Sequence, residues 1–334
     1  MSAIGDISHT LPILRTIQAA WPTTQISWII GKTEYELVKD IEGVEFIIFD
    51  KKRGLKGYFD IRKQLKGRQF DLLLHMQMSI RSSLISLFIN SPIKLGFDRA
   101  RAKDYQWLFT NHKIAARERE HVIDSFFGFT DAIGISERVV EWNIPIPEEA
   151  QQYAEQQLPD GAKYLIISPC SSMAYRNWLP DRYATVADYA VKNLGYQVVL
   201  TGGNSPIEQK YAIEIIELME EVPINLIGKS SLKQLLAVLK RAEIVIAPDS
   251  GPAHLATAVG TPVIGLYACT NPDRARPYMS HETTVNRYPE AIKQKYETGV
   301  SSVKWGERVR DEFAMPLIKI KDVTSILQTM GKTQ

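Results

Sequence analysis

Short runs of apolar, often β-branched residues alternate with amphipathic segments along the whole chain. This alternation is typical of parallel strands joined by crossover helices, so the sequence predicts an α/β fold. Strands are expected at residues 25–30, 45–50, 70–75, 93–96, 164–168, 197–201, 224–226, 244–247 and 263–267. Helices are expected at residues 9–20, 34–41, 58–66, 80–88 and 120–133, and later helices are expected to start near Asp181, Ile207, Leu232 and Gly251.

The segment IPIP at residues 144–147, followed by a polar helix, has the composition of a linker. A chain of 334 residues has room for about two domains of roughly 150 residues each. We therefore expect two Rossmann-like domains, residues 1–148 and residues 149–334, whose parallel sheets face each other across a cleft that holds the ligands. The sequence leaves open that the C-terminal helix packs back on the N-terminal domain.

The start of the chain departs from this pattern. A Rossmann-like domain begins with a strand, but this sequence begins in the small-residue loop that normally follows one. Either a first strand of roughly six to eight residues is missing from the sequence, or the N-terminal sheet forms without it. We favour a missing strand.

Composition and charge narrow the class of protein. Hydrophobic residues make up 45% and charged residues 23% of the chain, as in soluble globular proteins with sizeable cores. Forty basic and thirty-eight acidic residues leave a formal net charge of +2, which argues against a general nucleic-acid-binding protein. Cys170 and Cys269 lie far apart in the sequence, which argues against a disulfide framework or a cysteine-rich zinc site. Since the chain opens with no basic and apolar leader and no uninterrupted apolar stretch reaches roughly 20 residues, we expect a soluble, cytoplasmic protein.

The segment PDSGPAHL, residues 248–255, follows an expected buried strand and opens a helix. Phosphates bind at such helix N-termini in α/β domains, because the free backbone N–H groups there favour a negative group. Asp249, Ser250 and Gly251 can present side-chain oxygens and backbone N–H groups to a diphosphate, and His254 lies one turn further along. The alternative is a capped helix with a proline in its first turn and a histidine packed in the core.

The loop after the first expected strand of the second domain combines hydroxyl groups with a cation. Ser171, Ser172 and Arg176 are suited to a leaving pyrophosphate, because a fixed cation stabilises the charge that develops on it. For Arg176 the alternative is a surface salt bridge. Cys170 lies in the same loop, but the sequence places no base next to it, so a packing role is expected.

The N-terminal segment SAIGDISHTLP, residues 2–12, is a small-residue loop that leads into a helix. Gly5 lets the backbone approach a ligand closely, and the start of the helix favours a negative group. Asp6 is expected to project from this loop into the cleft. The alternative is an aspartate that only caps the helix.

Two further loops follow expected strands. The segment TGGN at residues 201–204 is followed by Glu208, and the segment GKSS at residues 228–231 contains Ser230. Each loop fits a close approach to a ligand as well as it fits an ordinary helix cap or turn. The sequence contains no Walker loop, no GxGxxG, no GxSxG and no HExxH motif. It therefore lacks the usual signatures of kinases, dehydrogenases, hydrolases and zinc proteases.

The charge is unevenly distributed. Residues 51–119 contain sixteen basic and five acidic residues, a net charge of +11. A basic segment in a nearly neutral protein suggests an anionic ligand or a membrane surface. The alternative is a solvated helix face whose charge is balanced by the other domain.

Three of these loops together resemble glycosyltransferase family 9, the ADP-heptose:lipopolysaccharide heptosyltransferases of Gram-negative bacteria. The resemblance rests on residues 2–12, on RNW at residues 176–178 and above all on DSGPAHL at residues 249–255. It spans about residues 1–277, and the segment KWGERV at residues 304–309 resembles a subset of the family.

The resemblance implies a GT-B fold with the nucleotide-sugar on the C-terminal domain and the acceptor on the N-terminal one. It also implies an inverting, metal-independent transfer of heptose from ADP-heptose to the inner core of lipopolysaccharide, without a cofactor. By this match Asp6 is the general base, and Arg176 stands where the family often has a lysine near the diphosphate. The substrate-binding residues expected from the loops and the resemblance together are Gly5, Ser171, Ser172, Glu208, Ser230, Asp249, Ser250, Gly251 and His254.

The basic segment is then expected to receive the anionic groups of the acceptor, and peripheral contact with the inner membrane stays open. No nucleic acid is expected to take part. Two alternatives remain: a GT-B transferase that uses another nucleotide-sugar or acceptor, and a non-catalytic nucleotide-sugar-binding protein in which a missing strand beside Asp6 misplaces the base.

Overall fold

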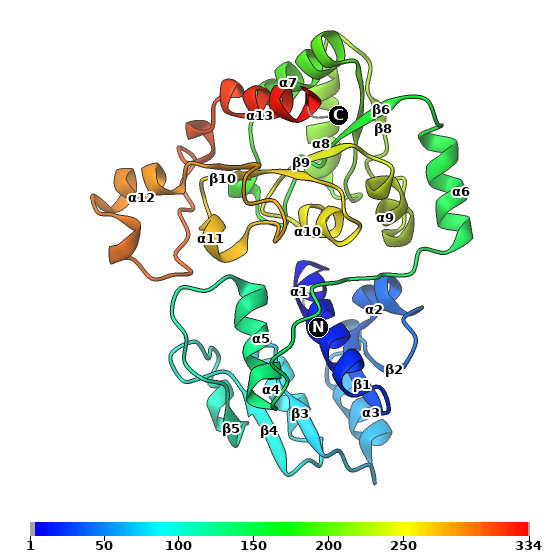
Figure 1. Ribbon diagram of the computed structural model, residues 1–334, viewed down its shortest axis with the longest axis vertical. Coiled ribbons are helices and arrows are strands. Elements are labelled where there is room, and N and C mark those ends of the chain that lie inside the picture. The colour runs from blue at the N-terminus through cyan, green and yellow to red at the C-terminus, as the bar shows by residue number, and fades with distance from the viewer. Residues whose placement is uncertain (1–3, 333–334) are drawn as a thin grey trace. The chain divides into compact units, whose positions relative to one another are not determined.

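The computed structural model describes residues 4–332, and the chain divides into two compact units, Met1–Pro145 and Ile146–Gln334. In both units helices alternate with strands, and every strand pair within the sheets is parallel (Figure 1). The predicted α/β class with parallel sheets is therefore confirmed. Within the described part of the chain, no helix is both long and apolar enough to span a lipid bilayer.

The second unit is built on one six-stranded sheet in the order β11-β10-β9-β6-β7-β8. Its strands are β6 (Lys163–Ile167), β7 (Tyr196–Leu200), β8 (Ile224–Asn225), β9 (Ile244–Pro248), β10 (Val263–Tyr267) and β11 (Thr284–Asn286). Numbered within the unit and starting from β8, this order is 3-2-1-4-5-6, the doubly wound Rossmann arrangement. β9 and β10 are buried along their whole length, as expected for parallel strands covered by helices on both faces.

The helices of this unit cover both faces of the sheet. They are α6 (Glu148–Gln157), α7 (Pro180–Leu194), α8 (Pro206–Leu218), α9 (Leu232–Lys240), α10 (Gly251–Ala258), α11 (Pro272–Ala275), α12 (Tyr288–Tyr296) and α13 (Ile320–Lys332). Short 3-10 turns are η3 (Ala174–Arg176), η4 (Val300–Ser302) and η5 (Met315–Leu317). The C-terminal helix α13 packs on α7, and its Val323 and Leu327 are fully buried in the core of the same unit.

The topological switch point of the second unit lies between β6 and β9. These strands pair directly, with Leu165 opposite Ile244, although the chain forms two other strands between them. From here successive strands are added outward in opposite directions, so the loops that leave the carboxyl ends of β6 and β9 diverge and leave room for a ligand. The loops predicted to carry Arg176 and Asp249 are these two.

The first unit contains two separate sheets, β1-β2 and β3-β4-β5. Its strands are β1 (Ile26–Gly31), β2 (Val44–Phe49), β3 (Leu72–Leu74), β4 (Ile93–Gly96) and β5 (His112–Lys113). Its helices are α1 (Ile4–Ala20), α2 (Lys32–Val38), α3 (Leu55–Leu65), α4 (Ile80–Ser86) and α5 (Val122–Ala132), with 3-10 turns η1 (Lys51–Arg53) and η2 (Gln106–Leu108).

The two sheets of the first unit match the two sides of the sheet in the second unit. The pair β2-β1 corresponds to strands 3-2 and the set β3-β4-β5 to strands 4-5-6 of the doubly wound order. Within residues 4–332, no strand occupies the place between β1 and β3 that β6 takes in the second unit. All three leucines of β3 are accordingly only half-buried, although parallel strands are normally covered on both faces.

The first helix begins earlier than the sequence predicts. α1 starts at Ile4 rather than near His9, so Gly5 and Asp6 lie in the first helical turn and not in a loop. Ser2 and Ala3, the first residues of the predicted loop, lie outside the described residues. The helix continues through Pro12, which cannot donate a backbone hydrogen bond to the carbonyl four residues earlier.

A side chain from the end of the unit replaces that lost bond. The indole Nε1 of Trp142 donates to the carbonyl oxygen of Ser8 at 2.7 Å, and Ser8 is the residue four positions before Pro12. Because both Ser8 and Trp142 are buried, water cannot satisfy this carbonyl instead. The proline is therefore tolerated inside α1, and the helix extends back to Ile4.

Candidate functional site

The loops after β6 and β9 are joined by a largely buried ion pair. Arg176, the last residue of η3, places its Nη1 3.1 Å from Oδ2 of Asp249, the residue after β9. The same Nη1 donates to the backbone carbonyl oxygen of Asp249 at 3.3 Å. The predicted cation and the predicted acidic motif, far apart in the sequence, therefore meet at the switch point of the sheet.

His254 completes this cluster from one turn inside α10. It is buried, and its Nε2 lies 3.8 Å from Oδ1 of Asp249. Burial by itself would raise the pKa of the Asp249 carboxyl, but the contact with His254 and the charge of Arg176 outweigh it, so the pKa is lowered. Asp249 is therefore ionised at neutral pH and orients both neighbouring side chains.

Two polar atoms of the cluster have no hydrogen-bond partner in the described structure: the Oγ of Ser250 and the Nε of Arg176. Ser250 is only 8% exposed, and it is the N-cap of α10 without making a side-chain cap bond. The backbone N–H groups in the first turn of any helix also lack intrahelical acceptors. A hydroxyl, a guanidinium N–H and a helix N-terminus thus converge as donors, a set that suits an anionic oxygen-rich group such as a phosphate.

The loop after β10 adds residues that the sequence analysis did not select. A narrow hollow of about 10 Å³ beside Asp249 has room for about one water molecule. Its other lining residues are Thr270, Asn271, Arg274, Ala275, Gly306, Glu307 and Arg308. Thr270 pairs with Arg308 in an isolated bridge, which brings the segment at residues 304–309 to this loop. The signal that would have identified them is position, because β10 is the neighbour of β9 and its carboxyl end lies at the same edge.

Ser171 and Ser172 lie in the same loop as Arg176, but neither of them belongs to the ion-pair cluster. The backbone N–H of Ser171 donates to Oδ1 of Asn177 at 2.7 Å, and the Ser171 hydroxyl donates to the carbonyl of Met173 at 2.8 Å. These bonds fix the shape of the loop. Ser172 is exposed. Burial raises the pKa of the neighbouring Cys170 thiol to about 12, which agrees with the packing role expected for it.

Glu208 and Ser230 lie after β7 and β8, towards one edge of the sheet. Glu208 closes a capping box at the start of α8 with Ser205, and its Oε1 accepts the backbone N–H of Gly203 at 2.6 Å. Its carboxylate is therefore engaged by its own loop. Ser230 is half-buried and directly precedes Ser231, the N-cap of α9.

Gly5 and Asp6 belong to the first unit. Asp6 is exposed in the first turn of α1, where a carboxylate interacts favourably with the helix dipole. The Thr10 hydroxyl donates to the backbone carbonyl of Asp6 at 3.0 Å, and the Ser8 hydroxyl donates to that of Gly5 at 2.6 Å. These local bonds hold the first turn in helical form with the Asp6 side chain on its surface.

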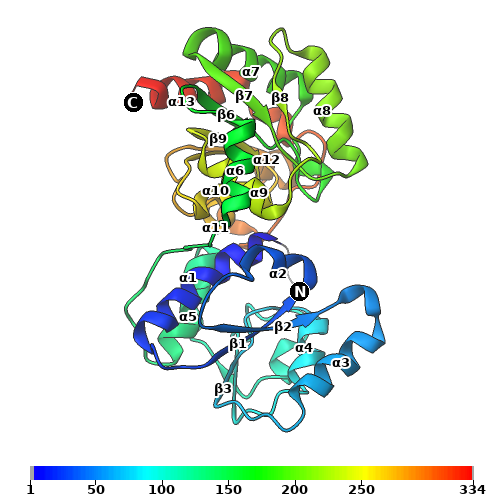
Figure 2. The same ribbon diagram turned by 90° about the vertical axis from the view of Figure 1, so that its right-hand side faces the viewer.

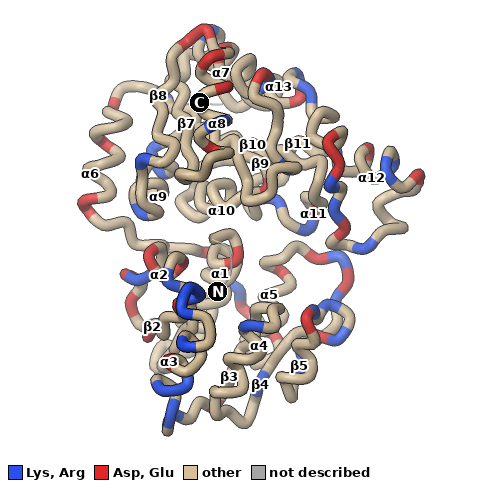
Figure 3. The backbone as a smooth tube through the Cα atoms, turned by 180° about the vertical axis from the view of Figure 1, so that it is seen from behind, with Lys and Arg blue, Asp and Glu red and all other residues tan. Residues whose placement is uncertain are grey.

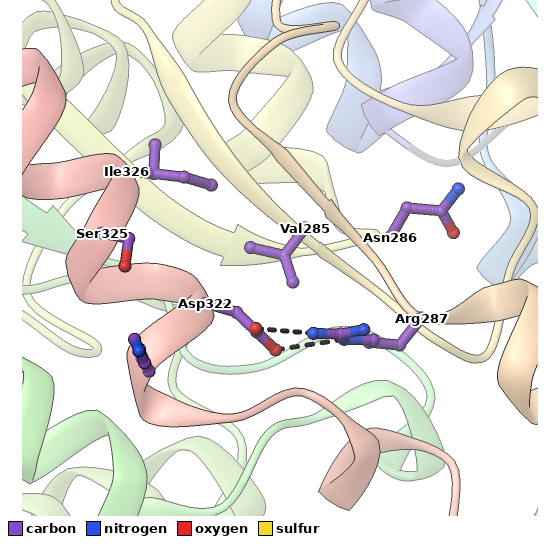
Figure 4. A pocket seen from close by; sticks show the side chains of 7 residues that line it. Val285, Asn286, Arg287, Asp322, Ser325 and Ile326 are labelled. Carbon is purple, nitrogen blue, oxygen red and sulfur yellow. Dashed lines mark hydrogen bonds and ion pairs between the residues drawn. The ribbon is translucent and has the colours of Figure 1, made fainter.

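An open hollow lies elsewhere in the second unit, on the surface between β11 and α13 (Figure 4). It measures about 460 Å³ and contains none of the predicted site residues. Arg287 and Asp322 face each other there in a two-pronged ion pair with N–O distances of 2.6 and 3.1 Å. This pair ties α13 to the chain after β11, which is a structural role. No group of three or more His, Cys, Asp or Glu side chains within residues 4–332 is arranged to hold a metal ion.

The chain is similar to a known protein family and to individual proteins. The model of the family described as glycosyltransferase family 9 (heptosyltransferase) matches residues 58–303. The lipopolysaccharide core heptosyltransferase OpsX of Haemophilus influenzae is 38% identical over 331 residues, which cover 99% of this chain and 95% of that protein. Lipopolysaccharide heptosyltransferase 3 of Escherichia coli K12 is 24% identical over 82% of each chain.

Solved structures resemble the whole chain. A family 9 glycosyltransferase from Veillonella parvula has a TM-score of 0.82 at 22% identity, covering 100% of this chain and 96% of its own. The E. coli heptosyltransferase WaaC with ADP-2-deoxy-2-fluoro heptose has a TM-score of 0.74 at 19% identity, covering 98% and 97%. At these identities the likeness shows a shared fold.

Proposed function

The chain belongs to glycosyltransferase family 9, a family of heptosyltransferases, and we propose that it transfers a heptose from ADP-heptose to the inner core of lipopolysaccharide. The observation that carries this proposal is the cluster of Arg176, Asp249 and Ser250 at the switch point of the second unit. Ligands of doubly wound sheets bind at this position. The relative from H. influenzae, which matches nearly the full chain, is named for this activity.

In this proposal the second unit, residues 146–334, binds the donor. Arg176 Nε, the Ser250 hydroxyl and the first turn of α10 with Gly251 donate to the diphosphate, while Ser171 and Ser172 line the same edge. Asp249 carries only acceptor atoms when ionised, so it does not bind phosphate. It holds Arg176 and His254 in place and can accept a hydrogen bond from a sugar hydroxyl.

The chemistry is a single displacement with inversion at the anomeric carbon. The acceptor hydroxyl oxygen forms the new bond to that carbon, the bond from carbon to the diphosphate oxygen breaks, and its electron pair leaves with ADP. Asp6, on the first unit, takes the proton of the acceptor hydroxyl, a contribution of typically about 10²–10⁴-fold for a positioned base. Arg176 and the N-terminus of α10 stabilise the negative charge on the leaving diphosphate.

We propose that the transfer needs no metal ion, because this positive charge comes from the protein itself. The first unit, residues 1–145, binds the anionic inner-core acceptor and works at the cytoplasmic side of the inner membrane. A transfer assay with a chelator present tests the first of these statements. Loss of activity that returns with a divalent cation would contradict it.

Thermal unfolding with ADP, ADP-heptose, UDP and UDP-glucose tests the donor class. A ligand at about 100 times its dissociation constant stabilises a protein by roughly 2.7 kcal/mol, a shift of several degrees. We expect a shift with the two adenine nucleotides only. A shift with uridine nucleotides alone would leave the fold and refute the donor assignment. Transfer of heptose to a heptose-free lipopolysaccharide, followed by mass spectrometry, then tests the acceptor.

A further inference from the structure

The outer face of α3 exposes two large apolar side chains. Leu55 is 77% and Phe59 66% exposed, and since they are four residues apart they lie next to each other on the helix surface. The opposite face of α3 is already packed, with Gly57, Ile61 and Leu65 buried against the unit. Leu55 and Phe59 are therefore not needed for the core, and their exposure marks a surface for contact with another apolar phase.

Cations surround this apolar pair. Lys56, Lys63 and Lys66 are exposed on α3 and at its end, and Lys52 is exposed in the turn before it. None of these four lysines has an ion-pair partner in the part of the chain that the structure describes. In Figure 3 the Lys and Arg positions of α3 and of the turn before it are blue.

Other basic side chains of residues 51–119 are neutralised. Most of the carboxylates that they pair with lie outside the segment, so its net charge does not count them. The pairs are Lys51 with Glu34, Arg68 with Glu45, Arg101 with Asp98 and Glu120, and Arg117 with Glu120 and Asp131. Unpaired positive charge is thus concentrated around Leu55 and Phe59.

The neighbouring helix α4, which contacts α3 (Figure 2), also exposes apolar side chains. Ile80, Leu84 and Leu87 recur at a helical spacing and are exposed. The turn with exposed Tyr105 and Leu108 is attached to the same helix, because Oδ2 of Asp104 accepts the backbone N–H of Ile80 at 3.3 Å.

We propose that the outer faces of α3 and α4 dock this protein on a bilayer that contains anionic phospholipid. Leu55 and Phe59 enter the boundary between headgroups and acyl chains, while the surrounding lysines contact lipid phosphates. This combination of apolar and basic side chains on one helix face is what interfacial binding to anionic lipid requires. The proposal rests on the proposed function, in which the acceptor is itself anchored to lipid.

Flotation of the full chain with vesicles tests the surface. One set of vesicles contains about one third phosphatidylglycerol in phosphatidylethanolamine, and the other is pure phosphatidylcholine. We expect binding to the first set only, and weaker binding as salt rises. The Leu55→Ser, Phe59→Ser double variant is expected to bind at least about 10-fold more weakly, because two apolar side chains no longer enter the boundary.

The matched control is the Ile213→Ser, Leu218→Ser variant, which replaces two exposed apolar residues of α8 in the other unit. It should bind vesicles like the unmodified chain. Equal binding by the Leu55/Phe59 variant, equal binding to both vesicle types, or binding only when lipopolysaccharide is added would each overturn the proposal. Since both residues are exposed, an unchanged melting temperature is expected to show that the variant folds.

Activity separates this proposal from the function on which it rests. With a water-soluble, deacylated acceptor the Leu55/Phe59 variant should turn over like the unmodified chain, and with acceptor embedded in vesicles it should be slower. If the unmodified chain floats with anionic vesicles but transfers no heptose, the proposed function fails and the docking surface stands. If it transfers heptose but never floats, the reverse holds.

Discussion

Arg176 and Asp249 lie 3.1 Å apart and join the carboxyl ends of the two central strands of the second unit. Because the Arg176 guanidinium contacts the Asp249 carboxylate, a diphosphate that binds Arg176 must share this cation with a carboxylate. The guanidinium has the geometry for this, because one edge can face the carboxylate while the Nε, which has no partner among the described residues, faces the ligand. The ion pair thus holds the Arg176 guanidinium in a fixed orientation in which it can bind an anion.

Two substitutions of Arg176 should distinguish how much its charge and how much its planar geometry contribute to ADP binding. We expect Arg176→Ala to weaken ADP binding by about 10–100-fold, because a hydrogen bond to a charged group contributes about 1.5–3 kcal/mol. Arg176→Lys should fall between, since lysine keeps the charge but cannot face two partners with one planar group. Isothermal titration calorimetry measures both, with Lys240→Ala as a control for loss of an exposed cation in the same unit. Unchanged ADP affinity in Arg176→Ala would refute the assignment.

Ser250→Ala should affect binding and stability in opposite directions. Its buried hydroxyl makes no bond in the described structure, so its removal should leave the free energy of unfolding unchanged or slightly higher. ADP affinity should fall several-fold. Ser231→Ala is the matched control, because Ser231 closes a capping box and its loss should cost about 1 kcal/mol of stability. Thermal melts with and without ADP measure both quantities, and a destabilised Ser250→Ala would show that the hydroxyl is already engaged.

Asp6→Asn tests the general base. We expect the turnover number to fall by about 10²–10⁴-fold, while ADP affinity changes by less than a few-fold. Glu42→Gln, which neutralises another exposed acid of the first unit, should retain activity. Steady-state kinetics beside calorimetry distinguishes the roles, and equal loss of turnover and ADP affinity would exclude Asp6 as the base.

The first unit should lose stability in mild acid because of His75. Burial lowers the pKa of this imidazole to about 4, against 6.5 for an exposed histidine. The unfolded chain therefore binds a proton that the folded chain does not, so His75 costs no stability above about pH 6.5 and costs progressively more as the pH falls towards 4. Between pH 7 and pH 5 we expect a loss of about 2 kcal/mol. Urea unfolding of the unmodified chain and His75→Asn should show a steeper decline in the former, and parallel declines would contradict this.

The loss of stability caused by Trp142→Phe should depend on Pro12. The substitution leaves the buried carbonyl of Ser8 without a donor, at an expected cost of about 1–3 kcal/mol. Pro12→Ala restores a backbone N–H four residues after Ser8, so in that background Trp142→Phe should cost measurably less. A double-mutant cycle in urea tests the coupling. An equal cost in both backgrounds would show that Trp142 acts by packing alone.

Strands with a long apolar run could be predicted closely, and short polar ones could not. β10 has the predicted bounds, Val263–Tyr267, because five buried apolar residues in a row leave little choice. β5 is only His112–Lys113 and is exposed, so no pattern in its own residues distinguishes it from a loop, and the strand exists because β4 offers a free edge. α1 was predicted too short at its N-terminal end, because residues 4–8 were interpreted as part of a small-residue loop although they form the first turn of the helix.

The residues of the candidate site also divide into those that the sequence could predict and those that it could not. Asp249 and Arg176 could be selected because both follow expected strands, and parallel topology alone brings such loops to one edge. Thr270 was missed for want of a motif, although the same positional argument applies to it. Glu208 carried its own explanation in the sequence, since Ser205 three residues earlier completes a capping-box pattern. The net charge of residues 51–119 overstated the basic surface, because the carboxylates that neutralise it come from other segments.

The division of the first unit into two sheets has a mechanical consequence. In the second unit a continuous ladder of backbone hydrogen bonds runs from β8 to β11, so the sheet resists deformation as one body. In the first unit the ladder is interrupted between β1 and β3, and among residues 4–332 only side chains and helices hold the two halves together. Side-chain packing tolerates small sliding movements that a hydrogen-bond ladder forbids. We therefore expect the first unit to yield under stress along this interval, between the half that carries β1–β2 and the half that carries β3–β5, before either half unfolds.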